Sequence, residues 1–248
     1  MLSIVIIEYN SLIEIKSFLS SIPADLASEI EVIISSNSQY SLGKQREISN
    51  SLKGVQWVFN ARNGGFAYGM NEGLKVAKGD VLVVANPDVK FKTSLKPMIA
   101  YLQEHKEVGI IGPKIVDDQG VIQDSYRSFF TPFGLLKRQL GWVKANGMPH
   151  VNDVKHPLEV DWVIGAFMMV RRDFYERVGG LSEDYFMYCE DIDWCKRAHL
   201  SGYKVVYYPE TIIEYKGTRS SRKHPKYTKI HIQSLITYWN KFGWTKER

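Results

Sequence analysis

The sequence has little cysteine and no long apolar run. Only two of its 248 residues are cysteines, Cys189 and Cys195. They lie six positions apart in a predicted helix, where about 100° per residue turns them to different faces, so we expect neither a disulfide nor a cysteine-rich metal site. No segment approaches the roughly 18 apolar residues of a membrane-spanning helix, and the apolar start lacks a basic leader. We therefore expect a cytoplasmic protein.

The common fingerprints of nucleotide and nucleic-acid binding are also missing. The sequence contains no P-loop, and the first predicted strand-to-helix turn, residues 8–11, has no glycine, so the dinucleotide fingerprint is absent. Neither a zinc-finger spacing nor an RNP-like aromatic motif is present. We therefore expect no nucleic-acid partner, and any nucleotide site must be built from other residues.

Positive charge is in excess and gathers in the last third of the chain. The formal net charge is +5 and the pI is about 9.0. The basic segment contains Lys216, Arg219, Arg222, Lys223, Lys226 and Lys229. Such a segment favours anionic partners, either substrate phosphates or an anionic membrane surface. A solvated basic face is the other interpretation, and the residues alone leave both open.

The first half of the chain alternates between strands and helices. β-Branched and apolar runs at residues 4–7, 32–34, 55–59 and 81–84 are each followed by a polar or glycine-rich turn. This order predicts an α/β fold with a parallel sheet, right-handed crossovers and helices on both faces. Ligands of such sheets bind beyond the carboxyl ends of the strands, which directs attention to the residues just after each run.

The second half has a less regular pattern. Residues 108–113 and 204–208 are predicted strands, the latter stopped by Pro209, and 160–170 is predicted as one buried strand. A long loop is expected over 128–157, with a short helix near 135–140. Helices are predicted at 173–179, 190–201 and 229–242, of which the last is amphipathic.

Two acidic positions indicate chemistry. Asp88 follows the buried run 81–84 and Pro87, where a hard carboxylate oxygen would suit Mg²⁺ or Mn²⁺, unless it only caps a turn. Glu190, Asp191 and Asp193 stand at a predicted helix start, where acids also complement the helix dipole. Apolar and aromatic neighbours would partly desolvate these carboxylates and raise the pKa of one of them toward that of a general base.

The glycines at 64–65 are a weaker signal. They follow Asn63 and precede a helical pattern, so their backbone amides could approach a diphosphate closely. The pattern does not match any dinucleotide fingerprint, and by itself it indicates only a tight turn before a helix.

Taken together, these segments resemble family 2 of the inverting glycosyltransferases, which have the GT-A fold, and especially its rhamnosyltransferase-like branch. The similar segments are residues 4–10, 63–67, 86–88, 108–113, 161–166, 190–193 and 217–220. The resemblance implies a single GT-A domain over 1–227, with a nucleotide-binding half at about 1–115 and an acceptor-binding half at about 116–227. Residues 228–248 would form the C-terminal amphipathic helix packed on that domain.

The resemblance also implies roles for individual residues. Asp88 corresponds to the metal-binding acid of the family's Asp-x-Asp motif, Asp191 to the catalytic base and Glu190 to its neighbour in the same motif. The implied metal ligands are Asp88 and Glu214, with Mg²⁺ or Mn²⁺ as the cofactor. The implied nucleotide-sugar site comprises Tyr9, Asn10, Asn37, Asn63, Gly64, Gly65, Asn86, Asp88, Gly165 and Ala166.

Three positions depart from the family pattern. Glu8 stands where a threonine or small residue is usual, Ser36 where an acid contacts the base or ribose, and Glu214 where a histidine binds the metal. We expect Glu8 to add negative charge near the nucleotide mouth, and the loss of the acid at Ser36 weakens any prediction of the nucleotide. Glu214 would still suit a hard cation, because carboxylate oxygen is a ligand that Mg²⁺ and Mn²⁺ prefer.

The expected function is transfer of a sugar from a nucleotide-diphosphate donor, with dTDP-rhamnose ahead of a UDP-hexose, to a glycan acceptor in cell-surface polysaccharide synthesis. A lipid-linked acceptor would bring the protein to the inner face of the membrane, where the basic amphipathic helix could make peripheral contact. The alternative is an inactive nucleotide-sugar or glycan-binding module on the same fold. Nucleotidyl transfer is disfavoured, because few basic residues that could grip phosphates occur early in the chain.

Overall fold

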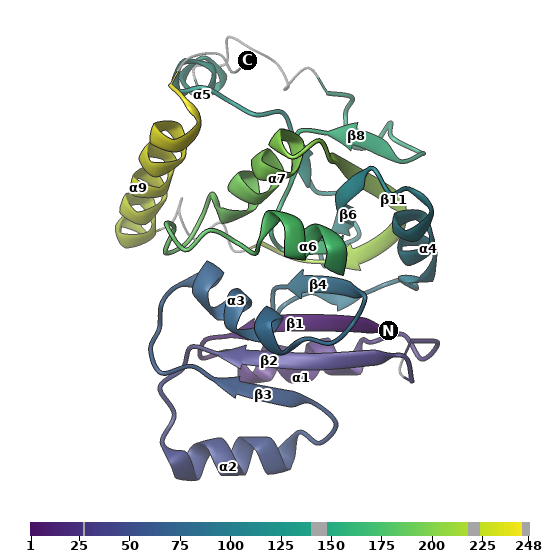
Figure 1. The fold of residues 1–248 in the computed structure, drawn as a ribbon, viewed down its shortest axis with the longest axis vertical. Helices are drawn as coiled ribbons and strands as arrows, with labels where there is room; N and C mark the ends of the chain where they lie inside the picture. The colour runs from purple at the N-terminus through teal and green to yellow at the C-terminus, as the bar shows by residue number, and fades with distance from the viewer. Residues whose placement is uncertain (27, 140–147, 218–223, 245–248) are drawn as a thin grey trace.

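The structure is a computed structural model that describes residues 1–26, 28–139, 148–217 and 224–244. Its centre is a nine-stranded sheet in the order β3-β2-β1-β4-β10-β6-β11-β5, with β8 also pairing to β11 (Figure 1). The four strands of the first half, β1 (Leu2–Glu8), β2 (Ile30–Ser36), β3 (Gln56–Phe59) and β4 (Val81–Ala85), are mutually parallel. The parallel sheet predicted from the alternating pattern is confirmed.

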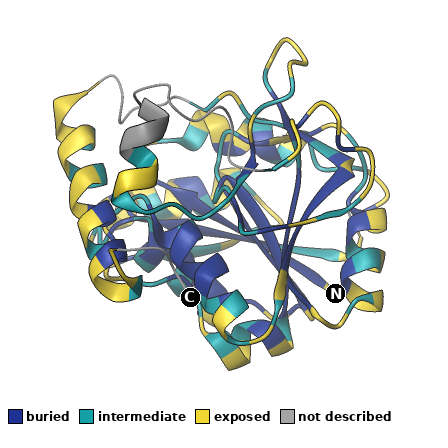
Figure 2. Ribbon diagram, turned by 90° about the horizontal axis from the view of Figure 1, so that it is seen from above, coloured by how far each residue is buried: buried dark blue, intermediate teal, exposed yellow. Residues whose placement is uncertain are grey.

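Helices cover both faces of this sheet, because alternate side chains of each strand point to opposite sides. On one face, Ile4 and Ile6 of β1 share a core with α1 (Leu12–Ser20) and α4 (Lys96–Glu104). On the other face, Val5 and Ile7 pack in the core that includes α3 (Phe66–Val76). The helix α2 (Leu42–Ser51) follows β2 and lies beside β3 in Figure 1. Figure 2 shows these central strands almost entirely buried.

The second half extends the sheet with mixed polarity. β10 (Phe167–Arg171) runs antiparallel between β4 and β6 (Val108–Val116), and β11 (Lys204–Glu214) is parallel to β6. The short strands β5 (Lys90–Phe91) and β8 (Leu158–Val160) pair antiparallel with β11, while β7 (Tyr126–Arg127) and β9 (Trp162–Val163) form a separate two-stranded sheet. The remaining helices are α5 (Pro132–Gln139), α6 (Arg172–Val178), α7 (Glu190–Leu200) and α9 (Pro225–Phe242).

Two predictions about strands are wrong. Residues 160–170 do not form one strand, but end β8, form β9, turn at Gly165 and begin β10. The turn arises because the amide of Gly165 donates to a side-chain carboxylate instead of to a neighbouring strand. Pro209 does not stop β11 either, since the strand continues to Glu214 through a register shift between Tyr208 and Ile212 that accommodates the proline. The short helix expected near residues 135–140 is present as α5 (Pro132–Gln139), and residues 140–147 of the expected loop lie outside the described residues.

The C-terminal helix α9 packs on α7 and its approach. Leu235, Tyr238 and Trp239 are buried in the same core as α7. The Ser234 hydroxyl donates to the carbonyl of Met187 at 2.8 Å, and the ammonium of Lys241 lies 2.8 Å from Oδ2 of the fully buried Asp193. The opposite face of α9 is exposed, as Figure 2 shows. Within the described ranges, no helix is long and apolar enough to cross a bilayer.

The ion pair between α9 and α7 gives a first prediction. Lys241→Met should lower the free energy of unfolding by about 1–3 kcal/mol, because Asp193 stays buried with one cation fewer. Urea denaturation followed by circular dichroism measures the change. Lys229→Met, at an exposed position of the same helix, is the control and should leave the midpoint within error. Equal midpoints for the two variants would show that the ion pair adds nothing.

Candidate active site

The loops after β2 and β3 are joined by buried amide side chains. Nδ2 of Asn37 donates to Oδ1 of Asn63 at 3.3 Å and to the carbonyl of Gly65 at 2.9 Å, while its Oδ1 accepts from Nδ2 of Asn60 at 2.8 Å. Tyr9, just after β1, keeps 55% of its surface exposed at the same edge of the sheet. These contacts join the two loops into one polar rim at the edge of the sheet, beside an exposed aromatic side chain.

The buried carboxylate of Glu8 connects the loops of this rim through hydrogen bonds. This carboxylate is fully buried and accepts hydrogen bonds from the amide of Ser11 and from three hydroxyls, those of Ser36, Ser38 and Tyr40, at 2.5–3.2 Å. The hydroxyl of Ser38 in turn accepts from the amide of Asn10, which has a left-handed φ of 53°. Glu8 is therefore buried inside the loops rather than exposed at their surface, and whether its charge acts on a bound nucleotide stays a prediction.

The glycines at 64–65 let two distant loops touch. A Cβ on Gly65 would lie 2.1 Å from the carbonyl oxygen of Phe186, and its φ of 95° already disfavours other residues. Phe66, the first residue of α3, donates its amide to that same carbonyl at 2.8 Å, and the Gly65 amide donates to Asn63. These two amides are therefore already engaged within the chain, and the glycine serves close backbone approach.

The turn after β4 holds Asp88 at the edge of the sheet. The Asn86 amide donates to the carbonyl of Ala166 at 2.9 Å, and Nδ2 of Asn86 donates to the phenol of Tyr215 at 3.0 Å. Asp88 is half-buried, and this burial raises the pKa of its carboxyl. No ion pair reaches Asp88 from the part of the chain that the structure describes. A carboxylate placed in this way is suited to a cation supplied from outside the chain.

Asp191 is held by the backbone of two segments. Its Oδ2 accepts from the amide of Gly165 and its Oδ1 from the amide of Ile192, each at 2.8 Å. A Cβ on Gly165 would approach the Cβ of Asp191 to 3.0 Å, so a larger residue would crowd this contact. Burial raises the pKa of Asp191, whereas the two amide hydrogen bonds act in the opposite direction. The carboxylate is thus both fixed in position and more basic than usual.

Glu190, its neighbour, differs in having an oxygen without a partner. It is 7% exposed, and its Oε2 has no hydrogen-bond donor among the described residues. Burial first, and then the charge of Asp191, raise the pKa of Glu190. Because Asp191 has two amide donors, we infer that the first negative charge of the pair rests on Asp191 while Glu190 keeps its proton.

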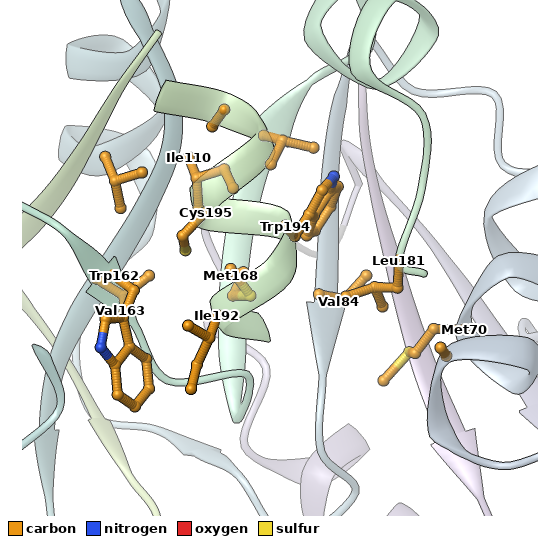
Figure 3. Close-up of a cluster of buried hydrophobic side chains, with 14 of the residues drawn as sticks. Met70, Val84, Ile110, Trp162, Val163, Met168, Leu181, Ile192, Trp194 and Cys195 are labelled. Atoms are coloured by element: carbon orange, nitrogen blue, oxygen red, sulfur yellow. The ribbon is translucent and has the colours of Figure 1, made fainter. Parts of the chain in front are cut away.

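The segment leading into this pair is strained, and the helix after it is firmly packed. Tyr188 and Cys189 both have left-handed backbones, with φ of 73° and 67°, immediately before Glu190. Such conformations persist only where the surrounding structure enforces them, and they gather at functional sites. Here the enforcement comes from α7, whose residues Ile192, Trp194 and Cys195 lie in the buried cluster of Figure 3. Both cysteines are free and buried, as predicted.

The two acidic motifs are connected through one backbone turn. The Asn86 amide donates to the carbonyl of Ala166, and the adjoining Gly165 donates its amide to Asp191. Tyr215 lies beside the first motif: burial first, and then the charge of Asp88, raise the pKa of Tyr215 to about 12, with a smaller contribution from Asp191.

Glu214 is placed differently from what its predicted role requires. Its two carboxylate oxygens pair with the ammonium groups of Lys92 at 2.7 Å and Lys90 at 3.0 Å, which hold the pKa of Glu214 below its usual range. The described residues contain no cluster of three or more potential metal ligands. Tyr215, which sequence reasoning missed, reaches Asn86 instead. The alternation of side chains along β11 could have indicated that 214 and 215 face opposite sides.

The basic segment is only partly visible. Arg219, Arg222 and Lys223 lie outside the described residues. Lys216 is exposed and pairs with Asp118 at 2.6 Å. Near Asp191, the guanidinium of Arg127 lies 5.5 Å from the ring of Trp162 and lowers the pKa of Asp191, though less than the amide donors do.

Family models match both halves of the chain. The model described as glycosyl transferase family 2 matches residues 3–179, which include the Asn86–Asp88 turn and Gly165. The model described as the N-terminal domain of galactosyltransferase matches residues 141–223, which include Glu190 and Asp191. The two matched ranges together contain every predicted site residue.

Curated relatives share 28% of their residues with this chain. One is the rhamnosyltransferase WbbL of Escherichia coli, over 96% of this chain and 92% of that protein. Another is the low-salt glycan biosynthesis hexosyltransferase Agl10 of Haloferax volcanii, over 79% of this chain and 61% of that protein. A third is the N-acetylglucosaminyl-diphospho-decaprenol L-rhamnosyltransferase of Mycobacterium tuberculosis, over 64% and 54%. The chain thus spans less than two thirds of the length of the latter two relatives.

Solved structures show the same fold at low sequence identity. The mannosyltransferase PcManGT of Pyrobaculum calidifontis, in complex with GDP-Man and Mn²⁺, has a TM-score of 0.64 and 15% identity over all of this chain and 65% of that one. GalNAc-T7, with UDP, GalNAc and Mn²⁺, has a TM-score of 0.63 and 17% identity over 87% and 43%. The predicted GT-A fold, with its mixed and mainly parallel sheet and its C-terminal helix, is confirmed.

The close approach at Gly65 gives a second prediction. Gly65→Ala should cost at least about 2 kcal/mol more unfolding free energy than Gly54→Ala, because only at position 65 must a backbone carbonyl move. Gly54 is the matched control, since its φ of 83° imposes a similar left-handed strain but nothing lies within 4 Å of its Cβ position. Urea unfolding of both variants measures the difference. Equal losses would mean that the Gly65–Phe186 contact relaxes without cost.

Proposed function

The chain belongs to glycosyl transferase family 2, and from this we propose that it transfers a sugar from a nucleotide-diphosphate donor to a glycan acceptor, with inversion at the anomeric carbon. One observation supports the proposal above all others: the turn bearing Asp88 and the helix start bearing Asp191 are joined through Gly165 and Ala166. Inversion needs a base on one side of the sugar and charge stabilisation on the other, and this arrangement provides both.

Asp191 is the proposed base. Its raised pKa and its fixed orientation suit removal of the acceptor hydroxyl's proton as that oxygen attacks the anomeric carbon. Glu190, protonated beside it, limits the negative charge at this point and is the proposed neighbour that holds the acceptor. Gly165 and Ala166, whose side chains are small, are the proposed floor beneath the donor sugar.

Asp88 is the proposed ligand of Mg²⁺ or Mn²⁺. The residues present suit such an ion, because Asp88 offers a half-buried carboxylate with no cation beside it in the described part of the chain. When bound, the ion would neutralise the diphosphate as it leaves. Glu214 remains a predicted second ligand, although it would first have to exchange Lys90 and Lys92 for the ion.

The nucleotide is proposed to lie along the rim at Tyr9, Asn10, Asn37 and Asn63. Rhamnose from dTDP-rhamnose is the proposed donor group, with a UDP-hexose second, because two of the relatives above are named as rhamnosyltransferases. A cell-surface polysaccharide is the proposed product. One relative's name contains a decaprenol diphosphate, and this supports a lipid-linked acceptor and a position at the inner face of the membrane.

We propose that the two halves of the chain bind different substrates. Residues 1–115 would bind the nucleotide and 116–227 the acceptor, with 228–248 bracing the second half through the contacts of α9. The alternative is a binding module without turnover. This alternative is favoured by the two lysines that occupy both oxygens of Glu214, because they take the place of the metal ion that the predicted reaction needs. Turnover by the wild-type protein separates the two functions.

Replacement of the base gives a third prediction. Asp191→Asn should lower kcat by roughly 10²- to 10⁴-fold while leaving donor affinity nearly unchanged, because only proton removal is lost. Release of nucleoside diphosphate in Mn²⁺ buffer measures turnover, and calorimetry measures affinity. Asp153→Asn, at an exposed site, is the control. In the wild type, kcat should rise with pH across a pKa above that of an ordinary aspartate, since Asp191 must lose its proton. Unchanged turnover in Asp191→Asn would exclude this base.

Metal dependence gives a fourth prediction. Mn²⁺ should raise the melting temperature of the wild type in the presence of nucleoside diphosphate, because a ligand of the native state stabilises it. Asp88→Asn should lose this rise in melting temperature with Mn²⁺. Glu214→Gln should keep the rise if wild-type Glu214 stays paired with Lys90 and Lys92 and does not bind the ion. Loss of the rise in Glu214→Gln instead would identify Glu214 as a ligand, and its retention in Asp88→Asn would contradict the proposed site.

A further inference from the structure

Tyr215 stands at the junction of the two acidic motifs without any role in the function proposed above. It follows the last residue of β11, and its phenol oxygen accepts a hydrogen bond from Nδ2 of Asn86 at 3.0 Å. The Asn86 amide is itself fixed by the carbonyl of Ala166, next to the residue that holds Asp191. The position of the phenol is therefore set by both motifs at once.

The hydroxyl proton of Tyr215 is available for a ligand. The phenol oxygen acts as an acceptor toward Asn86, because an amide nitrogen can only donate. Within the described ranges, no acceptor for the Tyr215 proton is found. A half-buried phenol that is held by Asn86 and whose proton has no acceptor in the described part of the chain can donate to a ligand bound beside the turn that bears Asp88.

We propose that Tyr215 is a catalytic residue that donates a hydrogen bond to the diphosphate oxygen that leaves the sugar. The proposal rests on the proposed function, since it assigns a contact to the same donor. It adds a neutral hydrogen-bond donor, Tyr215, to the predicted metal ligands Asp88 and Glu214.

The step balances without a further reactant. The acceptor oxygen forms its bond to the anomeric carbon while the bond from that carbon to the phosphate oxygen breaks. The acceptor's proton passes to Asp191, and the electron pair of the broken bond stays on the phosphate oxygen. Tyr215 keeps its own proton and shares it with that oxygen in a hydrogen bond that strengthens as negative charge develops.

The test compares Tyr215→Phe with Tyr207→Phe. Tyr207 is the matched control, because it lies on β11, the strand that Tyr215 follows, is fully buried and has a hydroxyl with no hydrogen-bond partner among the described residues. Tyr215→Phe should lower kcat for release of nucleoside diphosphate roughly 10- to 100-fold, whereas Tyr207→Phe should leave it unchanged. Urea midpoints of both variants check that each is folded.

A binding measurement separates catalysis from a merely structural role. With Mn²⁺ present, Tyr215→Phe should weaken dTDP and UDP several-fold but leave dTMP and UMP unchanged, because only the diphosphates carry the terminal phosphate. Equal weakening of the monophosphates and diphosphates would show that Tyr215 only supports Asn86, and would overturn the proposal. So would wild-type turnover in Tyr215→Phe.

Failure of the proposed function looks different from failure of this inference. If the wild type neither binds a diphosphate nor releases one from any donor, the glycosyltransferase proposal fails, and the role of Tyr215 fails with it. If the wild type turns over and the Tyr215→Phe variant matches it, only the inference about Tyr215 is wrong.

Discussion

The hydrogen bond from the Gly165 amide to Asp191 is the constraint on which the rest of the site depends. It takes a backbone donor away from the sheet, and so it makes the turn that precedes β10. The next residue, Ala166, offers its carbonyl to Asn86 and fixes the turn that bears Asp88. The turn at Gly165 and Ala166, just before β10, thus contacts both acidic motifs, although these lie about a hundred residues apart in the sequence. The pairing of β10 with β4, which begins at Phe167 and Ala85, holds the two turns side by side.

The buried carboxylates of the site differ in how many hydrogen bonds they accept, and this difference determines the electrostatics of the site. Glu8 is surrounded by four neutral donors, and Asp191 receives two amides. By contrast, one oxygen of Glu190 has no donor in the described structure. Desolvation raises the pKa of both Glu190 and Asp191, while the two amide hydrogen bonds to Asp191 act in the opposite direction. The adjacent acids therefore differ in how well their charged forms are stabilised, as the proposed division between a base and its protonated neighbour requires.

The sequence allowed the alternation of strands and helices in the first half, and their parallel sheet, to be predicted, because β-branched runs and polar turns are local signals. The position of Asp88 after a buried strand and of Glu190 at a helix start followed from the same signals. The contact of Asn86 with Ala166 could not be predicted locally, since it depends on an antiparallel strand inserted between β4 and β6. The hydrogen bond between Asn86 and Tyr215 could not be predicted either, because it joins residues that are far apart in the sequence.

The C-terminal helix links stability to the chemistry. Lys241 of α9 neutralises Asp193, one turn into the helix whose first residues are Glu190 and Asp191. Asp193 is fully buried and also receives Arg197 at 2.6 Å and the hydroxyl of Tyr185 at 3.1 Å, so Lys241 completes a buried set of partners that ties α9 to α7. Loss of one cation from this set would weaken the packing of the helix that begins at Glu190. The helix predicted to be amphipathic therefore supports α7 through its buried face, while Ile232 and Ile236 are exposed.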